Sequence, residues 1–289
     1  MDDRAAWLEG TIRDFINASP ANTLQNREND RAWEDPLVGF SRGDDPLYAT
    51  YKEVVGPFHW TPLEWFNLAF PRSRAAAKEL TVVSWVLPHT GKTRTEIRKA
   101  KADPPESWVR ARMFGEQVNV KLRRHVAEAL AAAGFEAMAP VLSPHWHMKY
   151  KDILSRYPYA SVWSERHAAY AAGLGTFSLN DALITARGIS HRCGSVIARI
   201  DVPPSPRPYT DHRAYCLFFS GKGRCGKCIK RCPAGAISPE GHDKAKCMDY
   251  LAKTQEYTAV HYGFDGYGCG FCQSGVPCEA KIPALPDKP

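Results

Sequence analysis

The alternation of apolar and polar positions predicts a mixed α/β body in the first two thirds of the chain. Residues 80–87 form an almost unbroken apolar run that ends at Pro88, a pattern typical of a buried strand. From 106 to 133 apolar residues recur at helical spacing until Gly134 interrupts them, which predicts one long helix. The remaining expected elements are strands at 135–142, 181–185 and 195–202, and an alanine-rich helix at 164–173.

Together these elements predict an α+β fold in three parts. We expect a largely helical segment at 1–75, an α/β domain at 76–210 and a small cysteine-rich module at 211–289. The 289 residues, 44% of them apolar, can supply a core without disulfide staples. No apolar run approaches the roughly 20 residues of a membrane helix, and the N-terminus does not resemble a signal peptide. We therefore expect a cytoplasmic protein with no membrane partner.

Charge adds little to this picture. The net charge of +7 is spread along the chain, and the densest basic stretches, Lys92–Lys101 and Lys121–Arg124, are expected to be solvated helix faces. A basic surface is compatible with an acidic redox partner, a phosphate-bearing cofactor or RNA. The sequence contains no recognised nucleic-acid module and no phosphate-binding glycine fingerprint, so charge alone selects none of the three.

The cysteines are more informative, because they are crowded into one part of the chain. One lies at Cys193, where we expect an ordinary buried thiol, and the other eight fall between Cys216 and Cys278. A disulfide framework is disfavoured, since such frameworks are typical of small secreted domains with too little core. The crowding therefore calls for a metal centre.

Zinc and iron–sulfur clusters are the two alternatives. Two C-x2-C pairs, Cys225 with Cys228 and Cys269 with Cys272, suffice for one four-thiolate zinc site but leave four nearby thiols unexplained. The spacing C-x2-C-x3-C-P at 225–233 instead matches the end of the bacterial ferredoxin run, whose last cysteine ligates the other cluster. This spacing favours two [4Fe-4S] clusters in a ferredoxin-like module.

The ferredoxin run is one ligand short in this chain. Lys222 stands where the usual first cysteine is found, and Cys216 is the natural substitute, because Gly221 and Gly223 allow the intervening loop to double back. The alternative is that Cys216 is a plain buried thiol. The crossed ligation of two-cluster ferredoxins assigns one cluster to Cys216, Cys225, Cys228 and Cys278, and the other to Cys232, Cys247, Cys269 and Cys272.

At this point the sequence resembles a known family, the epoxyqueuosine reductases, and more distantly the reductive dehalogenases. The resemblance extends from Leu80 to Cys278. The motifs on which it rests are Glu165-Arg166, Gly173-Leu-Gly175, Leu183-Ile184-Thr185, the cysteine run at 225–233, Lys246-Cys247-Met-Asp-Tyr250-Leu251, and Tyr267-Gly-Cys269-Gly-Phe-Cys272-Gln273. The resemblance implies a nitroreductase-like α/β domain that binds a corrinoid (cobalamin), followed by two [4Fe-4S] clusters. Gly173, Gly175 and Asn180 are the residues we expect in the corrinoid wall.

The sequence departs from the family pattern at the cysteines and at the position of the proposed proton donor. The last cysteine follows Cys272 after five residues, which is longer than in the family, and Cys216 is displaced by a longer loop. The family aspartate thought to deliver a proton is replaced by Tyr159, six residues before Glu165. A tyrosine is the proposed proton donor of the dehalogenases, so the resemblance makes Tyr159 a candidate general acid. The alternative is that Tyr159 and Tyr157 only pack a loop.

These observations predict an oxidoreductase that passes low-potential electrons through two clusters to a bound corrinoid, which reduces a small or nucleoside-like substrate. Its partner would be an electron donor of the ferredoxin or flavodoxin type. The competing prediction is an electron carrier that has no substrate of its own. Transfer RNA is possible but not favoured, because the chain ends eleven residues after Cys278 and lacks the helical repeats of some tRNA-acting relatives. His145 and His147 are expected to lie on the surface or line a pocket.

Overall fold

A central antiparallel sheet organises the chain in the computed structural model, which describes residues 3–150, 159–221 and 225–284. The strands follow the order β1-β2-β8-β3 and comprise Leu37–Arg42 (β1), Thr81–Pro88 (β2), His191–Ala198 (β8) and Ala137–Met138 (β3). Small two-stranded sheets are formed by Met148–Tyr150 (β4) with Tyr159–Ser161 (β5), Gly175–Phe177 (β6) with Leu183–Thr185 (β7), and Ile237–Ser238 (β9) with Gly241–His242 (β10).

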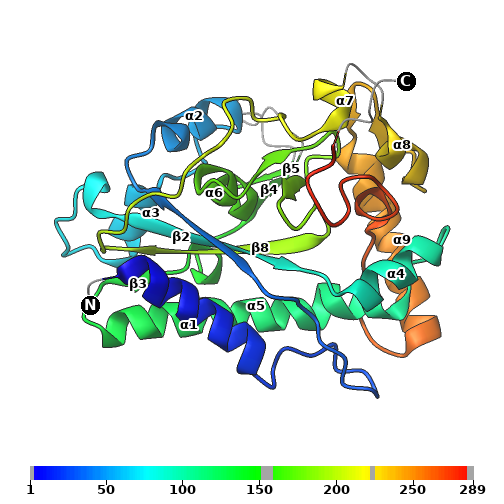
Figure 1. Ribbon diagram of the computed structural model, residues 1–289, viewed down its shortest axis with the longest axis horizontal. Helices are drawn as coiled ribbons and strands as arrows, with labels where there is room; N and C mark the ends of the chain where they lie inside the picture. Colours follow the sequence, from blue (N-terminus) through cyan, green and yellow to red (C-terminus); the bar gives the residue numbers. More distant parts are fainter. Residues whose placement is uncertain (1–2, 151–158, 222–224, 285–289) are drawn as a thin grey trace.

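Helices cover both faces of this sheet (Figure 1). The helices are Arg4–Ala18 (α1), Pro46–Val54 (α2), Pro62–Ala69 (α3), Gly91–Lys99 (α4), Glu106–Ala132 (α5), Glu165–Ala171 (α6), Leu217–Ser220 (α7), Lys227–Arg231 (α8) and Lys244–Tyr262 (α9). Short 3-10 turns lie at Ala77–Glu79 (η1), Pro140–Leu142 (η2) and Phe271–Gln273 (η3). In Figure 1, α1 and α5 lie below the sheet, and α2 and α6 lie above it.

The alternation of side chains along β2 explains why both faces are covered. Val83, Trp85 and Leu87 pack with α1 and α5, whereas Val82 and Val86 pack with α3 and α6. All eight residues of β2 are buried. A strand that is apolar at successive positions can bury its whole surface only between two layers. The prediction of a buried strand at 80–87 is confirmed, as is the long helix, which spans Glu106–Ala132.

Other boundaries differ from the sequence prediction. The strand expected at 135–142 is limited to Ala137–Met138, because Pro140 begins a 3-10 turn and cannot donate to a ladder. The strand expected at 195–202 begins earlier and spans His191–Ala198. The sequence also gave no signal for β1, which pairs with β2 along its whole length. The segment 1–75, predicted to be largely helical, therefore contributes an edge strand to the main sheet.

Gly39 explains how β1 fits into this sheet. A Cβ atom at Gly39 would lie 2.5 Å from the carbonyl oxygen of Ala172, so only glycine allows α6 to end this close to the strand. In the part of the chain that the structure describes, no helix has the length and apolar character needed to cross a bilayer. The division into segments 1–75, 76–210 and 211–289 stays a prediction.

Candidate functional site

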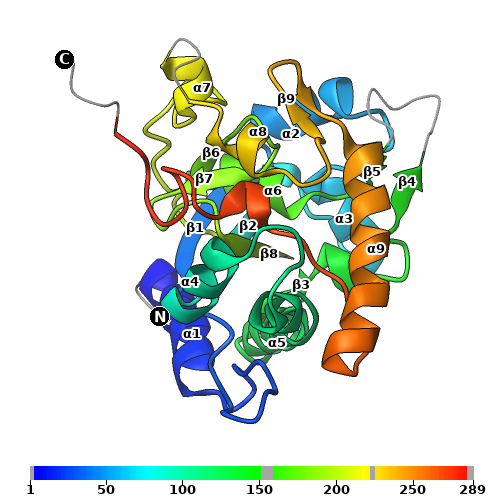
Figure 2. The ribbon, with the colours of Figure 1, turned by 90° about the vertical axis from the view of Figure 1, so that its right-hand side faces the viewer.

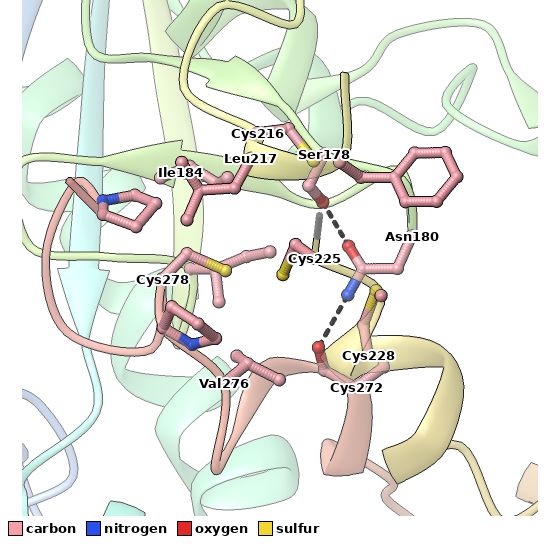
Figure 3. Close-up of a pocket in the computed structure, with 15 residues that line it drawn as sticks. Ser178, Asn180, Ile184, Cys216, Leu217, Cys225, Cys228, Cys272, Val276 and Cys278 are labelled. Carbon is pink, nitrogen blue, oxygen red and sulfur yellow. Dashed lines mark hydrogen bonds between the residues drawn. The ribbon is translucent and has the colours of Figure 1, made fainter. Parts of the chain in front are cut away.

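A single pocket at the end of the sheet is lined by five of the predicted ligands, namely Cys216, Cys225, Cys228, Cys272 and Cys278. Cys216, Cys225, Cys228 and Cys278, which we call the first cysteine group, come from three separate stretches of the chain. Figure 3 shows the sulfur atoms of Cys225 and Cys278 directed into the space between them. The rest of the lining is largely apolar and includes Ile184 and Ile189. Cys216 is thus brought to Cys225 and Cys228, as the sequence predicted.

Backbone contacts hold the last of these cysteines against the body. The amide of Ile189 donates to the carbonyl of Cys278 at 2.8 Å, and the amide of Ser190 donates to that of Glu279 at 3.2 Å. Gly188 has a φ of +81°, and a Cβ atom there would lie 2.3 Å from the oxygen of Glu279. Glycine is needed at this position for both reasons. The residues that precede β8 therefore position Cys278.

The other four predicted ligands form a second cysteine group, which contains Cys232, Cys247, Cys269 and Cys272. Burial raises the pKa of the Cys269 thiol to about 12, and the neighbouring Cys247 and Cys232 raise it further. The pKa of Cys272 is raised by burial and by the same neighbours. Thiols that influence one another in this way lie close together. These thiols lose their protons when metal is bound, because the positive charge of the metal offsets the cost of burying thiolates.

Burial raises the pKa of thiols in the first group as well. Burial raises the pKa of Cys228 to about 11, with additional contributions from Cys216 and Cys225. Burial likewise raises the pKa of Cys278 to about 12. Cys272 lines the pocket of the first group and also neighbours the second, so the division of the eight cysteines between two clusters, like their roles as ligands, stays a prediction.

The two groups adjoin each other along α8. Cys228 lies in this helix and Cys232 follows it directly, while Cys272 lines the first pocket and neighbours the second group. Among the described residues, no three His, Cys, Asp or Glu side chains converge closely enough to hold a single metal ion. A cubane cluster does not need such convergence, because each thiolate binds a different iron atom.

Two polar side chains tie the cysteine loops to the rest of the molecule. Arg231 donates to the carbonyls of Ser274 at 3.1 Å, Ala100 at 3.2 Å and Ile97 at 3.0 Å, which joins α8 to η3 and to the end of α4. Figure 2 shows η3 between these two helices. The side-chain amide of Asn180 donates to the carbonyl of Cys272 at 2.8 Å (Figure 3). Both contacts fix the backbone beside a cysteine.

A charged cluster connects α6 with the second cysteine group. Arg166 donates to the backbone carbonyl of Asp181 at 2.5 Å, and the Asp181 carboxylate lies 3.4 Å from His242 and 3.7 Å from Lys244. Burial lowers the pKa of His242, but Asp181 and Cys247 outweigh it and raise the value to about 9. His242 is therefore a cation at neutral pH and lies beside a cysteine of the second group.

The three residues predicted for the corrinoid wall contact protein. A Cβ atom at Gly173 would lie 2.3 Å from the oxygen of Pro206, and one at Gly175 would lie 2.1 Å from the oxygen of Ile184. These glycines permit backbone to approach backbone. Asn180 lines the first cysteine pocket and holds Cys272. Their assignment to a corrinoid stays a prediction.

Tyr159, the predicted proton donor, lies at the start of β5 and pairs through its backbone with Tyr150. Its side chain is partly buried. Arg156 and Tyr157, which the sequence placed beside it, lie outside the described residues. The structure therefore locates the backbone of Tyr159 without describing the loop that precedes it.

The histidines of 145–147 lie on the surface. Both His145 and His147 are exposed, and His145 lines an open groove of about 690 Å³ beside η2. This groove contacts β3, which Figure 1 shows at the opposite end of the molecule from α8. The groove is thus remote from the first cysteine group.

A buried ion network lies beneath the Glu165-Arg166 motif. Arg123 is only 2% exposed, and its guanidinium lies 3.1 Å from Glu165 and 3.0 Å from Glu116. It also donates to the carbonyl of Cys193 at 3.2 Å. Burial raises the pKa of Glu165, and Arg123 only partly offsets this effect. The ion pair gives Glu165 a positioning role at the start of α6.

This network corrects the sequence prediction for Lys121–Arg124. Lys121 and Arg124 are exposed as expected, but Arg123 points into the interior. A signal was present, because Arg123 occupies the stripe of the helix that also carries the buried Asn119 and Val126. The expectation for Cys193 is confirmed, since its thiol is 9% exposed in the middle of β8.

Comparison with known proteins agrees with the predicted resemblance. No protein-family model matches the chain. A curated epoxyqueuosine reductase from Francisella cf. novicida (strain Fx1) is 31% identical over 134 residues, which cover 43% of this chain and 34% of the relative. The chain is similar to epoxyqueuosine reductases. The match spans about a third of the length of this curated relative.

Solved structures of two kinds are similar to the chain, and one of them, a reductive dehalogenase, is similar enough to indicate a shared fold. A catabolic reductive dehalogenase in complex with 3-bromo-4-hydroxybenzoic acid matches with a TM-score of 0.50 at 16% identity, covering 96% of this chain and 37% of the dehalogenase. An epoxyqueuosine reductase with an epoxyqueuosine-modified tRNA-Tyr stem loop matches with a TM-score of 0.47 at 16% identity, covering 96% and 68%. Both kinds of protein are oxidoreductases. The ferredoxin-like arrangement of residues 211–289 stays a prediction.

Proposed function

We propose that this protein is an iron–sulfur oxidoreductase that carries single electrons through two [4Fe-4S] clusters to an active site in the α/β body. The observation that carries the proposal is the proximity of the eight cysteines: five line one pocket, and the remaining three lie close to Cys272. One cluster would be held by Cys216, Cys225, Cys228 and Cys278, and the other by Cys232, Cys247, Cys269 and Cys272.

The surroundings of the cysteines suit this task. When bound, the clusters supply one-electron transfer at low potential. The protein contributes thiol ligands and an apolar lining around the first group that includes Val276 and Ile184. Arg231 and Asn180 fix the loops, so that little movement accompanies a change in oxidation state.

The electron acceptor in this proposal is a corrinoid, as in the enzymes that the sequence resembles. The 31% identity to an epoxyqueuosine reductase favours a nucleoside-like substrate over a halogenated aromatic one. Because Gly173 and Gly175 are packed against protein backbone, we assign no described residue to the corrinoid. The same observation favours the second candidate, an electron carrier that serves a separate partner.

Anaerobic reconstitution with iron, sulfide and cobalamin tests the proposal. We expect about eight irons and eight sulfides per chain, with the electron paramagnetic resonance signal of reduced [4Fe-4S] clusters. Cobalt retained in stoichiometric amount would support the corrinoid reductase, and its absence would support the carrier. Zinc with little iron or acid-labile sulfide would overturn both. Epoxyqueuosine and a brominated phenol are the first substrates to assay.

Tyr159 is the proposed proton donor in the reductase. Conversion to phenylalanine removes the phenolic proton and keeps the ring, so turnover should fall by about 10²–10⁴-fold while cluster content stays unchanged. The matched control is Tyr48→Phe, which alters a buried tyrosine whose hydroxyl bonds Ser41. Undiminished turnover of the Tyr159 variant would remove this residue from the mechanism.

A further inference from the structure

The surface around the first cysteine group is basic. On the stretches that build the pocket, the exposed cations are Arg213, Lys227, Lys230 and Lys281, which we call the basic rim. Lys227 adjoins Gly226 in the lining, and Lys281 lies two residues before Pro283, which is also in the lining. The residues of the rim are therefore exposed positions on the segments that build the pocket.

The lysines of the rim are not neutralised within the described part of the protein. No ion pair is formed by Lys227, Lys230 or Lys281 there. Two carboxylates lie on the same stretches: Asp211 is exposed, and Glu279 lies 3.1 Å from the guanidinium of Arg98. The rim consequently keeps an excess of positive charge.

The second cysteine group has mixed surroundings. Around Cys247 the exposed residues include the acids Glu240, Asp243 and Asp249 and the cations Lys246 and Lys253. Lys244 lies 3.7 Å from Asp181, and Lys246 lies 3.7 Å from Asp243. The acids and cations of this region largely balance, so a negatively charged protein would be attracted more strongly to the first group.

Apolar surface accompanies the positive charge at the first group. Phe218 and Pro277 line the pocket, and the guanidinium of Arg213 stacks on the ring of Phe219 at 4.0 Å. A cationic rim around a small apolar centre is typical of a docking face for another protein. An RNA would instead need cations arranged along a track that follows its phosphates.

We propose that the basic rim is the docking face for an acidic, low-potential electron-carrier protein, so that electrons enter through the first cysteine group and leave through the second. This inference rests on the proposed function. Each encounter transfers one electron. With a flavodoxin as carrier, the anionic flavin hydroquinone loses one electron and becomes the neutral semiquinone, which keeps its proton. One cluster accepts that electron.

Stopped-flow reduction of the reconstituted protein by photoreduced flavodoxin tests this inference. The rim variant carries Lys227→Glu, Lys230→Glu and Lys281→Glu. The control variant reverses an equal number of exposed cations elsewhere, with Lys121→Glu and Arg124→Glu on α5 and Lys253→Glu on α9. We expect the second-order rate of the rim variant to fall about tenfold or more at low ionic strength. The difference should largely vanish at about 0.5 M salt, where surface charges are screened.

Reduction by dithionite separates this inference from the proposed function. If dithionite reduces the clusters of both variants normally, an unchanged flavodoxin rate in the rim variant would overturn the docking face alone. Equal slowing in the control variant would also overturn it, because Lys253 lies on the helix of the second group. Absence of any reducible cluster in the unmodified protein would instead overturn the proposed function.

Binding of an unmodified tRNA stem loop supplies the last test. We expect the rim variant to bind this RNA as the control variant does, measured by fluorescence anisotropy at equal salt concentration. A specific loss of RNA affinity in the rim variant, together with an unchanged flavodoxin rate, would make the rim a nucleic-acid site and refute electron-carrier docking.

Discussion

In the α/β body, residues 3–210, apolar side chains fill the space on both sides of the sheet, whereas the cysteine segment, residues 211–284, buries few of them. The body contains two clusters of buried residues that include Trp33, Trp85 and Trp163. In α9, which is 19 residues long, the buried residues are Thr254 and Thr258. Many of the apolar contacts of the cysteine segment are made by the cysteines themselves.

This difference indicates two sources of stability. Burial of apolar surface, worth about 25 cal/mol per Å², suffices for the body. The cysteine segment depends on ligation, because metal-binding free energy becomes folding free energy where the apolar core is small. The contacts made by Arg231 and Asn180 then join one region to the other. The variants below test this division, beginning with the largest expected effect.

Removal of iron should unfold the cysteine segment and spare the sheet. After anaerobic chelation, we expect amide exchange to rise by several orders of magnitude in α8 and α9, while β2 and β8 keep their protection. Hydrogen–deuterium exchange with mass spectrometry measures both regions in one sample. Loss of protection in β2 and β8 as well would mean that the two regions fold as one unit.

The opposite perturbation targets the body. Arg123→Ala leaves Glu165 in the interior without its cation and removes one of the two cations beside Glu116, so the free energy of unfolding should fall by about 3 kcal/mol. Urea denaturation measures this change, and the iron content of the folded fraction should stay unchanged. The control is Arg124→Ala at the exposed neighbouring position, with an effect of about 0.5 kcal/mol or less. If the variant lost iron while its free energy of unfolding stayed at the native value, the assignment of separate sources of stability to the body and the cysteine segment would be contradicted.

Arg231→Met tests the first link between the regions. The variant keeps most of the aliphatic stem and loses the donors to Ser274, Ala100 and Ile97, which should cost about 1.5–3 kcal/mol locally. Faster amide exchange in α8 and η3 would be the expected result, with α5 unchanged. Lys230→Met, at an exposed position in the same helix, is the matched control.

Asn180→Ala should have the smallest effect. It removes the bond to the carbonyl of Cys272 and leaves the amide of Ala182 without its side-chain acceptor, at a cost of about 1 kcal/mol. We expect iron to be lost to a chelator a few times faster, while urea denaturation of the body changes little. An exposed amide in α1, Asn17→Ala, serves as the control. Equal rates of iron loss in the two variants would show that Asn180 does not support the cysteine segment.

The parts of the fold that the sequence predicted are those determined by local patterns. The strand at 80–87 and the helix beginning at 106 follow from apolar periodicity over many residues. The strand β1 was missed because Gly39 and Ser41 break its pattern, and its conformation depends on pairing with β2. Similarly, Arg123 appeared to belong to a solvated face, since its partner Glu165 is distant in the sequence.

The sequence by itself determined which residues are able to ligate iron, because eight cysteines and the spacing at 225–233 are covalent features of the chain. Only the tertiary structure decided how these thiols are grouped and what surrounds them. Cys216 meets Cys278 because the backbone beside β8 holds the last loop, and the exposed lysines belong to segments that the fold brings to one pocket. Grouping and surface charge depend on contacts between segments far apart in sequence, which no local pattern specifies.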